Sequence, residues 1–213
     1  MSEPRHLNRT GFFYALPFLG NAMLLTPLIT FVPSFYSGDP ATGGHGLPLA
    51  LVGQIIFFTR LLDIIAEPIV GVLSDATRTR LGRRKPWILG GMPLLALATW
   101  MVFAPPVAVT PAYAALWIAL AYLGYTVVET PYSAWGAELS KTYGGRTRIA
   151  GWKQSFGILS SLAALSLIVV LQAQGRTDLS DMMFWLGMAF VSATPLLFLV
   201  CLVVVPEPPA ERI

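Results

Sequence analysis

Residues 60–86 read RLLDIIAEPIVGVLSDATRTRLGRRKP, an apolar helical stretch that holds three ionisable side chains and ends in a dense basic loop. At 100° per residue, one face of this helix, within an arc of about 80°, carries Arg60, Asp63, Glu67 and Gly71. An Asp at the centre of a membrane helix costs about 2.5–3.5 kcal/mol on insertion scales. We therefore expect this face to lie against protein or a wet cavity and not against lipid.

Two interpretations of the charged face remain open. In the first, Arg60 pairs with Asp63 or Glu67 as a packing salt bridge between neighbouring turns of the helix. In the second, two acids against one base leave a spare carboxylate, which is the kind of group that binds a coupling cation or takes up a proton.

The composition of the chain predicts an all-α integral membrane protein. Hydrophobic residues make up 55% and charged residues 12%, with a mean hydropathy of +0.65, whereas soluble domains have about 25% charged residues. Each predicted span approaches the roughly 20 residues that cross the hydrocarbon core, and barrel-type alternation is absent from them. The predicted spans, which form a six-helix transmembrane bundle, are 11–36, 48–74, 87–106, 111–138, 149–173 and 182–205.

The distribution of positive charge predicts the topology. Basic residues gather before the first span, after the last, and in the loops after the second and fourth, whereas the opposite loops hold only Arg176. The positive-inside rule then places both termini in the cytoplasm. We expect a cytoplasmic amino-terminal segment at 1–10, the bundle at 11–205 and a cytoplasmic proline-rich tail at 206–213. Topology accounts for the net charge of +3, so membrane lipid is an expected partner and nucleic acid is not.

A second polar motif follows the charged face at the end of the same helix. Asp75 stands at the helix end, where its carboxylate can accept hydrogen bonds from arginines or from a neighbouring helix amino terminus. We expect a cytoplasmic latch that contains Gly71, Asp75, Arg78, Gly82, Arg83 and Arg84. An anchor for anionic lipid is the alternative explanation for most of these arginines.

The first and fourth spans add candidate binding residues. Prolines interrupt the first span, which makes it a candidate moving or cavity-lining helix, and Asn21 within it either bonds a neighbouring helix or contacts a substrate. The fourth span repeats polar aromatic and acidic residues at spacings of 3, 4 and 3, in Tyr122, Tyr125, Glu129 and Tyr132. Phenol rings beside an acid suit a sugar, and an ordinary aromatic packing stripe is the alternative.

The charged stretch resembles a signature of the glycoside-pentoside-hexuronide cation symporters of the major facilitator superfamily, the family of the melibiose carrier. RLLDIIAEPIVGVLSDATRTRLGRRKPWIL is similar to their second helix and the loop after it, although Glu67 stands where the family usually has Asp. VVETPYSAWGAELSKTYGGRTRIAGWKQSFG, residues 127–157, resembles their fourth and fifth helices, with Glu129, Pro131 and Tyr132 matching an acid-x-Pro-aromatic motif.

The resemblance implies which residues bind ion and substrate. It implies a cation site of Asp63, Glu67 and Glu129, with Na⁺ or H⁺ as the coupling ion and neither a cofactor nor any other metal. It also implies a substrate-binding residue on the fifth helix, for which Lys153 is the nearest match and Gln154 the alternative. Together with the sequence pattern, the candidate substrate-binding residues are Asn21, Arg60, Tyr122, Tyr125, Tyr132 and Lys153.

The resemblance covers only the amino-terminal half of a twelve-helix fold, a bundle built as a 3+3 inverted repeat. Because such carriers rock two six-helix bundles around a midplane site, the expected partner is a separate second half or a second copy of the chain. The expected function is that of a half-size subunit of a secondary active transporter, coupling Na⁺ or H⁺ to symport of a sugar, glycoside or related small organic solute. The alternative is a non-transporting membrane assembly subunit or a remnant of a longer transporter.

Two further expectations follow from the sequence. An enzyme is not expected, because neither a nucleophile–His–acid set, a metal motif nor a phosphate loop is recognisable. The expected location is a bacterial inner membrane.

Overall fold

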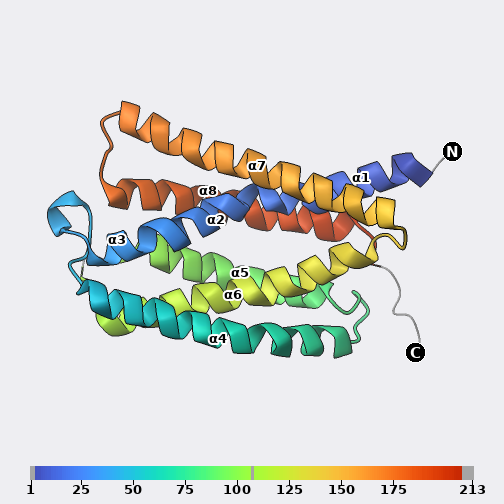
Figure 1. Cartoon of the computed structure of the whole chain (residues 1–213), viewed down its shortest axis with the longest axis horizontal. Helices are drawn as coiled ribbons and strands as arrows, with labels where there is room; N and C mark the ends of the chain where they lie inside the picture. The colour runs from blue at the N-terminus through green and yellow to red at the C-terminus, as the bar shows by residue number, and fades with distance from the viewer. Residues whose placement is uncertain (1–2, 107, 208–213) are drawn as a thin grey trace.

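The computed structural model describes residues 3–106 and 108–207, with side chains from residue 8 onward, as a bundle of long helices lying side by side (Figure 1). Six stretches in these ranges are long and apolar enough to cross a membrane, which confirms the predicted all-α six-span fold. The elements are α1 (Glu3–Ala15), η1 (Leu16–Gly20), α2 (Asn21–Thr26), η2 (Pro27–Phe31), α3 (Val32–Ser37), η3 (Pro40–Thr42), α4 (Leu49–Ala76), α5 (Lys85–Phe103), α6 (Pro111–Glu138), α7 (Tyr143–Ala173) and α8 (Leu179–Val204).

The boundaries differ from the expected ones mainly at the ends of helices. α1 already begins at Glu3, and α7 begins at Tyr143, six residues before the expected start. Thr142 explains the second difference, because its side chain accepts a hydrogen bond from the Gly145 backbone N–H and caps the helix. Residues 208–213 of the expected tail lie outside the described residues.

The first span, α1 to α3, is broken as its prolines predict. η1 is a 3-10 turn that contains Pro17, and η2 is a π-helical turn that begins at Pro27. Such turns change the pairing of backbone groups, so side chains from other helices have to complete it. Ser160 of α7 does this, since its Oγ accepts the Ala22 backbone N–H at 3.0 Å and its side chain is fully buried.

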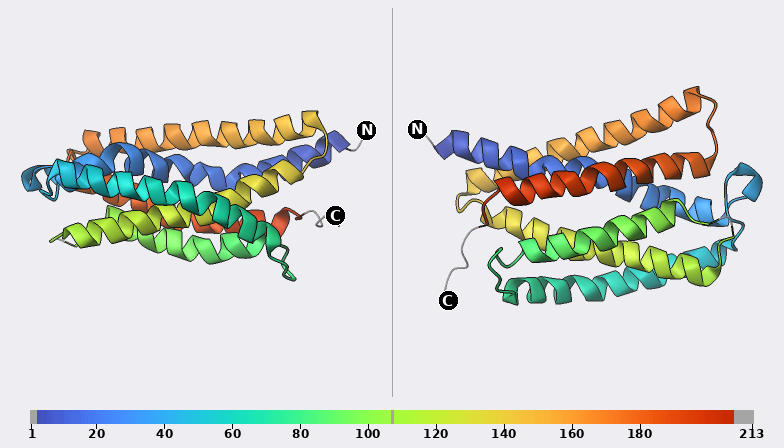
Figure 2. Two further views of the ribbon diagram at one scale, coloured as in Figure 1. Left: turned by 60° about the horizontal axis from the view of Figure 1, so that its bottom comes forward. Right: turned by 180° about the vertical axis from the view of Figure 1, so that it is seen from behind.

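The six spans pack as two interlocked sets of three. The first span lies against α7 and α8, whereas α6 packs on α4 and α5 (Figures 1 and 2). The first helix of each half of the chain therefore packs with the second and third helices of the other half. This exchange agrees with the predicted 3+3 organisation.

The described chain begins and ends at the same end of the bundle, together with the α4–α5 and α6–α7 loops (Figure 1). The basic residues of both loops thus gather at one end. The side of the membrane that this end faces stays a prediction.

The first span is tied to α6 by a pair of tyrosines at the core. Tyr14 and Tyr132 stack with ring centroids 4.5 Å apart, and the Tyr14 hydroxyl donates to the Tyr132 carbonyl oxygen at 2.8 Å. The Tyr132 hydroxyl in turn donates to the Tyr14 carbonyl. Both side chains are almost fully buried, so this reciprocal pair fixes the register of the first span against α6.

Removal of the Ser160 hydroxyl tests the repair of the broken span. Ser160→Ala leaves the Ala22 N–H buried without an acceptor, and we expect it to lower the free energy of unfolding by about 1–2 kcal/mol. Ser161→Ala is the matched control, because the Ser161 hydroxyl is exposed and donates only to the Gly157 carbonyl of its own helix. Thermal unfolding in detergent measures both variants, and equal losses would contradict this role of Ser160.

Candidate functional site

The charged face of α4 meets α6 at Asp63. Thr126 of α6 is buried, and its hydroxyl donates to Asp63 Oδ1. Arg60 Nη1 lies 3.9 Å from Asp63 Oδ2, a separation longer than a hydrogen bond, and the Arg60 guanidinium carbon lies 4.2 Å from the centroid of the Tyr122 ring. Asp63 therefore has one hydrogen-bond donor, one loosely placed cation and a side chain that is 25% exposed.

Glu67 is the spare carboxylate of this face. Its side chain is exposed on α4, one turn beyond Asp63, and forms neither a hydrogen bond nor an ion pair within residues 3–106 and 108–207. Arg60 pairs with Asp63 and not with Glu67. Each of the two interpretations of the charged face thus fits one acid: Asp63 is paired with Arg60, and Glu67 is the carboxylate without a counter-charge among the described residues.

Glu129 takes part in a separate cluster on α6. Glu129 Oε1 accepts hydrogen bonds from Ser133 Oγ at 2.6 Å and from Lys153 Nζ of α7 at 2.7 Å. Lys153 Nζ also donates to Ser133 Oγ at 2.9 Å, which closes a triangle of polar groups. The described part of the chain brings no three Asp, Glu, His or Cys side chains together in a way that could hold a metal ion. The three predicted cation ligands therefore do not converge on one point: Asp63 and Glu67 share a face of α4, whereas Glu129 belongs to the cluster with Lys153.

Lys153 is the fifth-span residue that faces the site, whereas Gln154 is exposed on α7. The Lys153 ammonium lies 4.5 Å from the centroid of the Phe18 ring and 5.0 Å from that of Tyr132. Its head group therefore turns inward to Glu129 and the two rings, although its position near the helix start would also let it extend toward the membrane surface.

Asn21 and Tyr125 line a small cavity beside the Glu129 cluster. The Tyr125 hydroxyl donates to Asn21 Oδ1 at 3.3 Å, and the cavity wall also includes Glu129 and Thr194 of α8. Thr194 is 2% exposed, and its hydroxyl finds no partner among the described residues. Residues of the first span, α6 and α8 thus line one small, partly open cavity whose wall is mostly apolar.

The three tyrosines of α6 have different surroundings. Tyr125 lines the cavity, Tyr122 packs beneath Arg60, and the Tyr132 hydroxyl is bonded to the Tyr14 carbonyl in the core. Packing in the core thus accounts for Tyr132, whereas a role of Tyr122 and Tyr125 in solute binding stays a prediction.

The structure adds three residues that the sequence interpretation did not single out: Thr126, Ser133 and Phe18. Thr126 and Ser133 lie three residues before and four residues after Glu129, positions that share one helix face. That spacing is a signal in the sequence. The contact of Phe18 with Lys153 depends on the break in the first span, and no sequence pattern predicts it.

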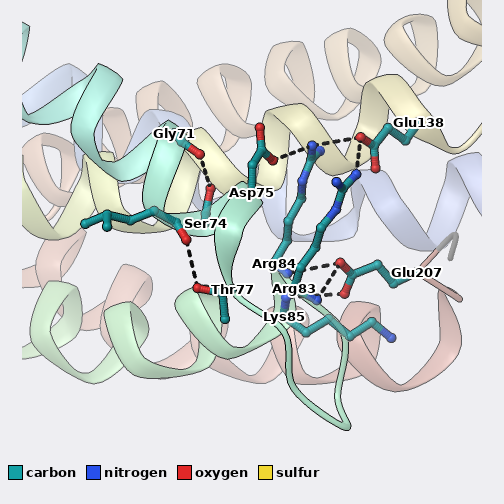
Figure 3. A network of polar contacts seen from close by, with 10 residues as sticks. Gly71, Ser74, Asp75, Thr77, Arg83, Arg84, Lys85, Glu138 and Glu207 are labelled. Carbon is teal, nitrogen blue, oxygen red and sulfur yellow. Dashed lines mark hydrogen bonds and ion pairs between the residues drawn. The ribbon is translucent and has the colours of Figure 1, made fainter. Parts of the chain in front are cut away.

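Several of the predicted latch residues lie in an ion-pair network around Arg84, which is buried at the end of the bundle that holds the α4–α5 loop (Figure 3). Arg84 Nη2 lies 2.9 Å from Asp75 Oδ1 and 2.8 Å from Glu138 Oε1. Arg83 also donates to Glu138, and this hydrogen bond raises the pKa of the Arg83 guanidinium. Glu138, at the end of α6, is thus a latch residue that sequence reasoning missed.

Glu207 holds the other side of the same loop. Its carboxylate accepts the backbone N–H groups of Arg83 and Arg84, each at 3.0 Å, where the dipole of α5 favours negative charge. Gly82 has φ = 108°, and a Cβ there would lie 2.0 Å from Glu207 Oε2. Lys85, at the start of α5, bonds the end of α8 in turn, since its Nζ donates to the carbonyls of Leu202 and Val205 at 2.7 and 2.8 Å. The start of α5 and the end of α8 therefore cap each other.

Two of the expected latch residues lie outside this network. The Gly71 carbonyl accepts a hydrogen bond from the Ser74 hydroxyl at 3.0 Å (Figure 3). Arg78 is exposed and has neither an ion pair nor a hydrogen bond within the described ranges. The structure thus joins Asp75 to Arg84 directly, links Arg83 to Arg84 through Glu138, and places Gly82 against Glu207.

Comparison with known proteins identifies the family. A family model described as MFS/sugar transport protein matches residues 13–212. An uncharacterised symporter of Synechocystis sp. is 36% identical over 158 residues, which cover 68% of this chain and 28% of that protein. The inner membrane symporter YicJ of Escherichia coli is 32% identical over 130 residues, 58% of this chain and 28% of YicJ. The putative glycoside/cation symporter YagG of Escherichia coli is 28% identical over 137 residues, 61% of this chain and 30% of YagG.

The chain belongs to this MFS/sugar transport family, and the resemblance to glycoside-pentoside-hexuronide symporters is confirmed. The family is one of transporters and not of enzymes, and the six apolar spans make the chain an integral membrane protein. The matched stretches span only 28 to 30% of the length of these relatives.

The latch predicts unequal roles for its two acids. Arg84 is 4% exposed, and its Nε and Nη1 atoms have no partner among the described residues, so loss of Glu138 would leave a buried charge poorly paired. Glu138 is 32% exposed, and we expect Glu138→Gln to cost about 1–3 kcal/mol of stability. Asp75→Asn, at a side chain 55% exposed, should cost about 0–1 kcal/mol.

Chemical unfolding of the two purified variants measures this difference. Each variant replaces one carboxylate with an amide and leaves every basic residue at this end unchanged, so the two variants differ only in which acid is lost. A larger loss for Asp75→Asn than for Glu138→Gln would contradict the central position of Glu138 in the network.

Proposed function

We propose that this chain forms one six-helix bundle of a cation-coupled symporter for a sugar, glycoside or related polar solute, and works opposite a second six-helix bundle. The observation that carries the proposal is a pair of polar contacts that α6 makes with its neighbours, Thr126 with Asp63 of α4 and Glu129 with Lys153 of α7, inside a largely apolar bundle. Ionisable groups inside a membrane bundle typically mark ion or substrate pathways.

Asp63 is the proposed ligand of the coupling ion, either Na⁺ or H⁺. Its carboxylate has an oxygen supplied nearby by Thr126 and only a distant contact with Arg60, so an incoming cation can neutralise it without breaking a close ion pair. Glu67, exposed one turn away, adds negative charge that favours cation entry. Binding of the ion then favours the conformations in which Asp63 is neutralised.

The proposed solute-binding surface consists of Asn21, Tyr125 and the Lys153–Glu129 pair. These groups offer hydrogen-bond donors and acceptors next to the faces of Tyr125 and Phe18, which suits a ring with polar edges and an apolar face. Our proposed surface leaves out Tyr132, because its hydroxyl is engaged in the core. Support for a carrier of such solutes also comes from the similarity to YagG, a putative glycoside/cation symporter.

A second bundle would cover apolar surface that this bundle leaves open. α4 exposes a series of large apolar side chains, and only 11% of its most apolar stretch is buried inside the bundle, against 44% for α5. Lipid or a facing bundle can cover such a surface, and the alternating-access mechanism requires the latter. We place the latch end, with both termini, on the cytoplasmic side of a bacterial inner membrane, because its loops carry the excess of basic residues.

Substitution of Asp63 tests the ion site. At a Na⁺ concentration about 100 times Kd, binding should stabilise the wild-type chain by about 2.7 kcal/mol relative to choline at equal ionic strength. Asp63→Asn should remove this stabilisation, and Thr126→Val should weaken Na⁺ binding roughly tenfold. If the ion is H⁺, the stabilisation appears instead as the pH is lowered, and it disappears in the same variant.

Asp178→Asn provides the control, because Asp178 is an exposed loop acid at the start of α8. Thermal unfolding in detergent gives the first readout, and uptake of labelled sugars and glycosides into vesicles holding both bundles gives the second. An Asp63→Asn protein that keeps full cation-dependent stabilisation and uptake would refute the proposal. Full stability with neither ion dependence nor uptake in the wild type would favour a non-transporting assembly subunit.

A further inference from the structure

We propose that Glu129, Ser133, Phe18 and Tyr132 form a binding site for an organic ammonium ion, and that the side chain of Lys153 is its built-in occupant. The site itself rests on the geometry of these residues. Its consequence, that the coupling ion does not bind at Glu129, rests on the proposed function.

The ligands of the site are all groups that attract a cation. Glu129 Oε1 lies 2.7 Å and Ser133 Oγ 2.9 Å from the ammonium nitrogen of Lys153. The rings of Phe18 and Tyr132 lie 4.5 and 5.0 Å from the same nitrogen, within the range of about 6 Å in which an aromatic face attracts a cation. A carboxylate, a hydroxyl and two aromatic faces around one nitrogen make a complete ammonium site.

The occupant and the walls come from different helices. Glu129, Ser133 and Tyr132 belong to α6 and Phe18 to the 3-10 turn of the first span, whereas Lys153 reaches in from α7. The walls are therefore held without Lys153: Tyr132 is fixed by its hydrogen bonds with Tyr14, and Ser133 is bonded to Glu129 directly. Shortening of Lys153 should consequently leave an empty site and not a collapsed one.

The site separates the roles of the two clusters on α6. Lys153 already supplies the positive charge that Glu129 needs, whereas Asp63 has only a hydroxyl donor and an arginine 3.9 Å away. A second cation at Glu129 would have to displace a covalently attached ammonium whose effective concentration is high. The coupling ion is thus confined to Asp63, and the Lys153–Glu129 pair stays a neutral polar surface toward the solute.

Truncation of Lys153 followed by addition of small amines tests this site. Lys153→Ala removes three carbons and the nitrogen of the side chain, and n-propylammonium has the same atoms. Lys153→Met leaves a space only where the terminal nitrogen was, and the ammonium ion fits that space. We expect n-propylammonium to raise the thermal unfolding midpoint of Lys153→Ala at a concentration about tenfold lower than it does for Lys153→Met. The ammonium ion should show the opposite preference, and wild-type protein should respond to neither beyond the effect of equal ionic strength.

One further variant and a property of Lys153→Met complete the test. Lys153→Ala combined with Glu129→Gln should lose the response to n-propylammonium, because the site then lacks its carboxylate. Lys153→Met keeps nearly the full length of the side chain and provides the test even where Lys153→Ala does not fold. Equal shifts in all variants, or a missing response in Lys153→Met to the ammonium ion, would overturn the proposal.

These outcomes are independent of the proposed transport function, since they need neither solute nor a second bundle. A positive amine response together with unchanged Na⁺ dependence in Asp63→Asn would retain the ammonium site and refute the ion site at Asp63. Loss of the Na⁺ response in Lys153→Met while Asp63→Asn keeps it would refute the assignment of separate roles.

Discussion

A carboxylate inside an apolar membrane bundle requires a counter-charge or a hydrogen-bond donor, because the surrounding medium solvates it poorly. α6 meets this requirement twice. Thr126 provides a hydroxyl to Asp63 of α4, and Glu129 of α6 receives the ammonium of Lys153 from α7. Both sets of three spans are therefore joined through the polar face of α6, and the unequal pairing of the two carboxylates gives them different chemistry.

The break in the first span places further groups at the same face. The 3-10 turn brings Phe18 to the Lys153 ammonium, and Asn21 begins the next helical piece with its side-chain oxygen on the Tyr125 hydroxyl. Ser160 and the Tyr14–Tyr132 pair hold the broken segment in position. The distortion caused by the prolines is thus fixed by the neighbouring helices, so that the polar face has a defined geometry inside the bundle.

Much of the fold follows from the sequence, because hydrophobic length decides where a helix crosses a membrane. The spacing of Arg60 and Asp63 also made their contact one of the pairings that the sequence left open, since residues three apart share a helix face. Contacts between helices could not be obtained in this way. The spacing of Thr126 places it on the same face of α6 as Glu129, but its hydrogen bond to Asp63 depends on how α4 packs against α6.

The ion-pair network around Arg84 shows the same limit. The basic loop and Asp75 are visible in the sequence, but Glu138 lies 54 residues from Arg84 and Glu207 lies 123 residues from it. The family resemblance implied that Glu129 is a cation ligand. In the structure its carboxylate is already bonded to the ammonium group of Lys153 from α7. A motif gives the residue type, and the packing of the helices decides which partner that residue has.

A double-mutant cycle between Glu129→Gln and Lys153→Met tests most directly whether Lys153 is the permanent counter-charge of Glu129. The measured quantity is the free energy of unfolding of the wild type, both single variants and the double variant in detergent. We predict that the double variant is more stable than the sum of the single losses implies, with a coupling energy of about 1–3 kcal/mol. Additive losses, within about 0.5 kcal/mol, would show that the two side chains do not interact and would contradict the account.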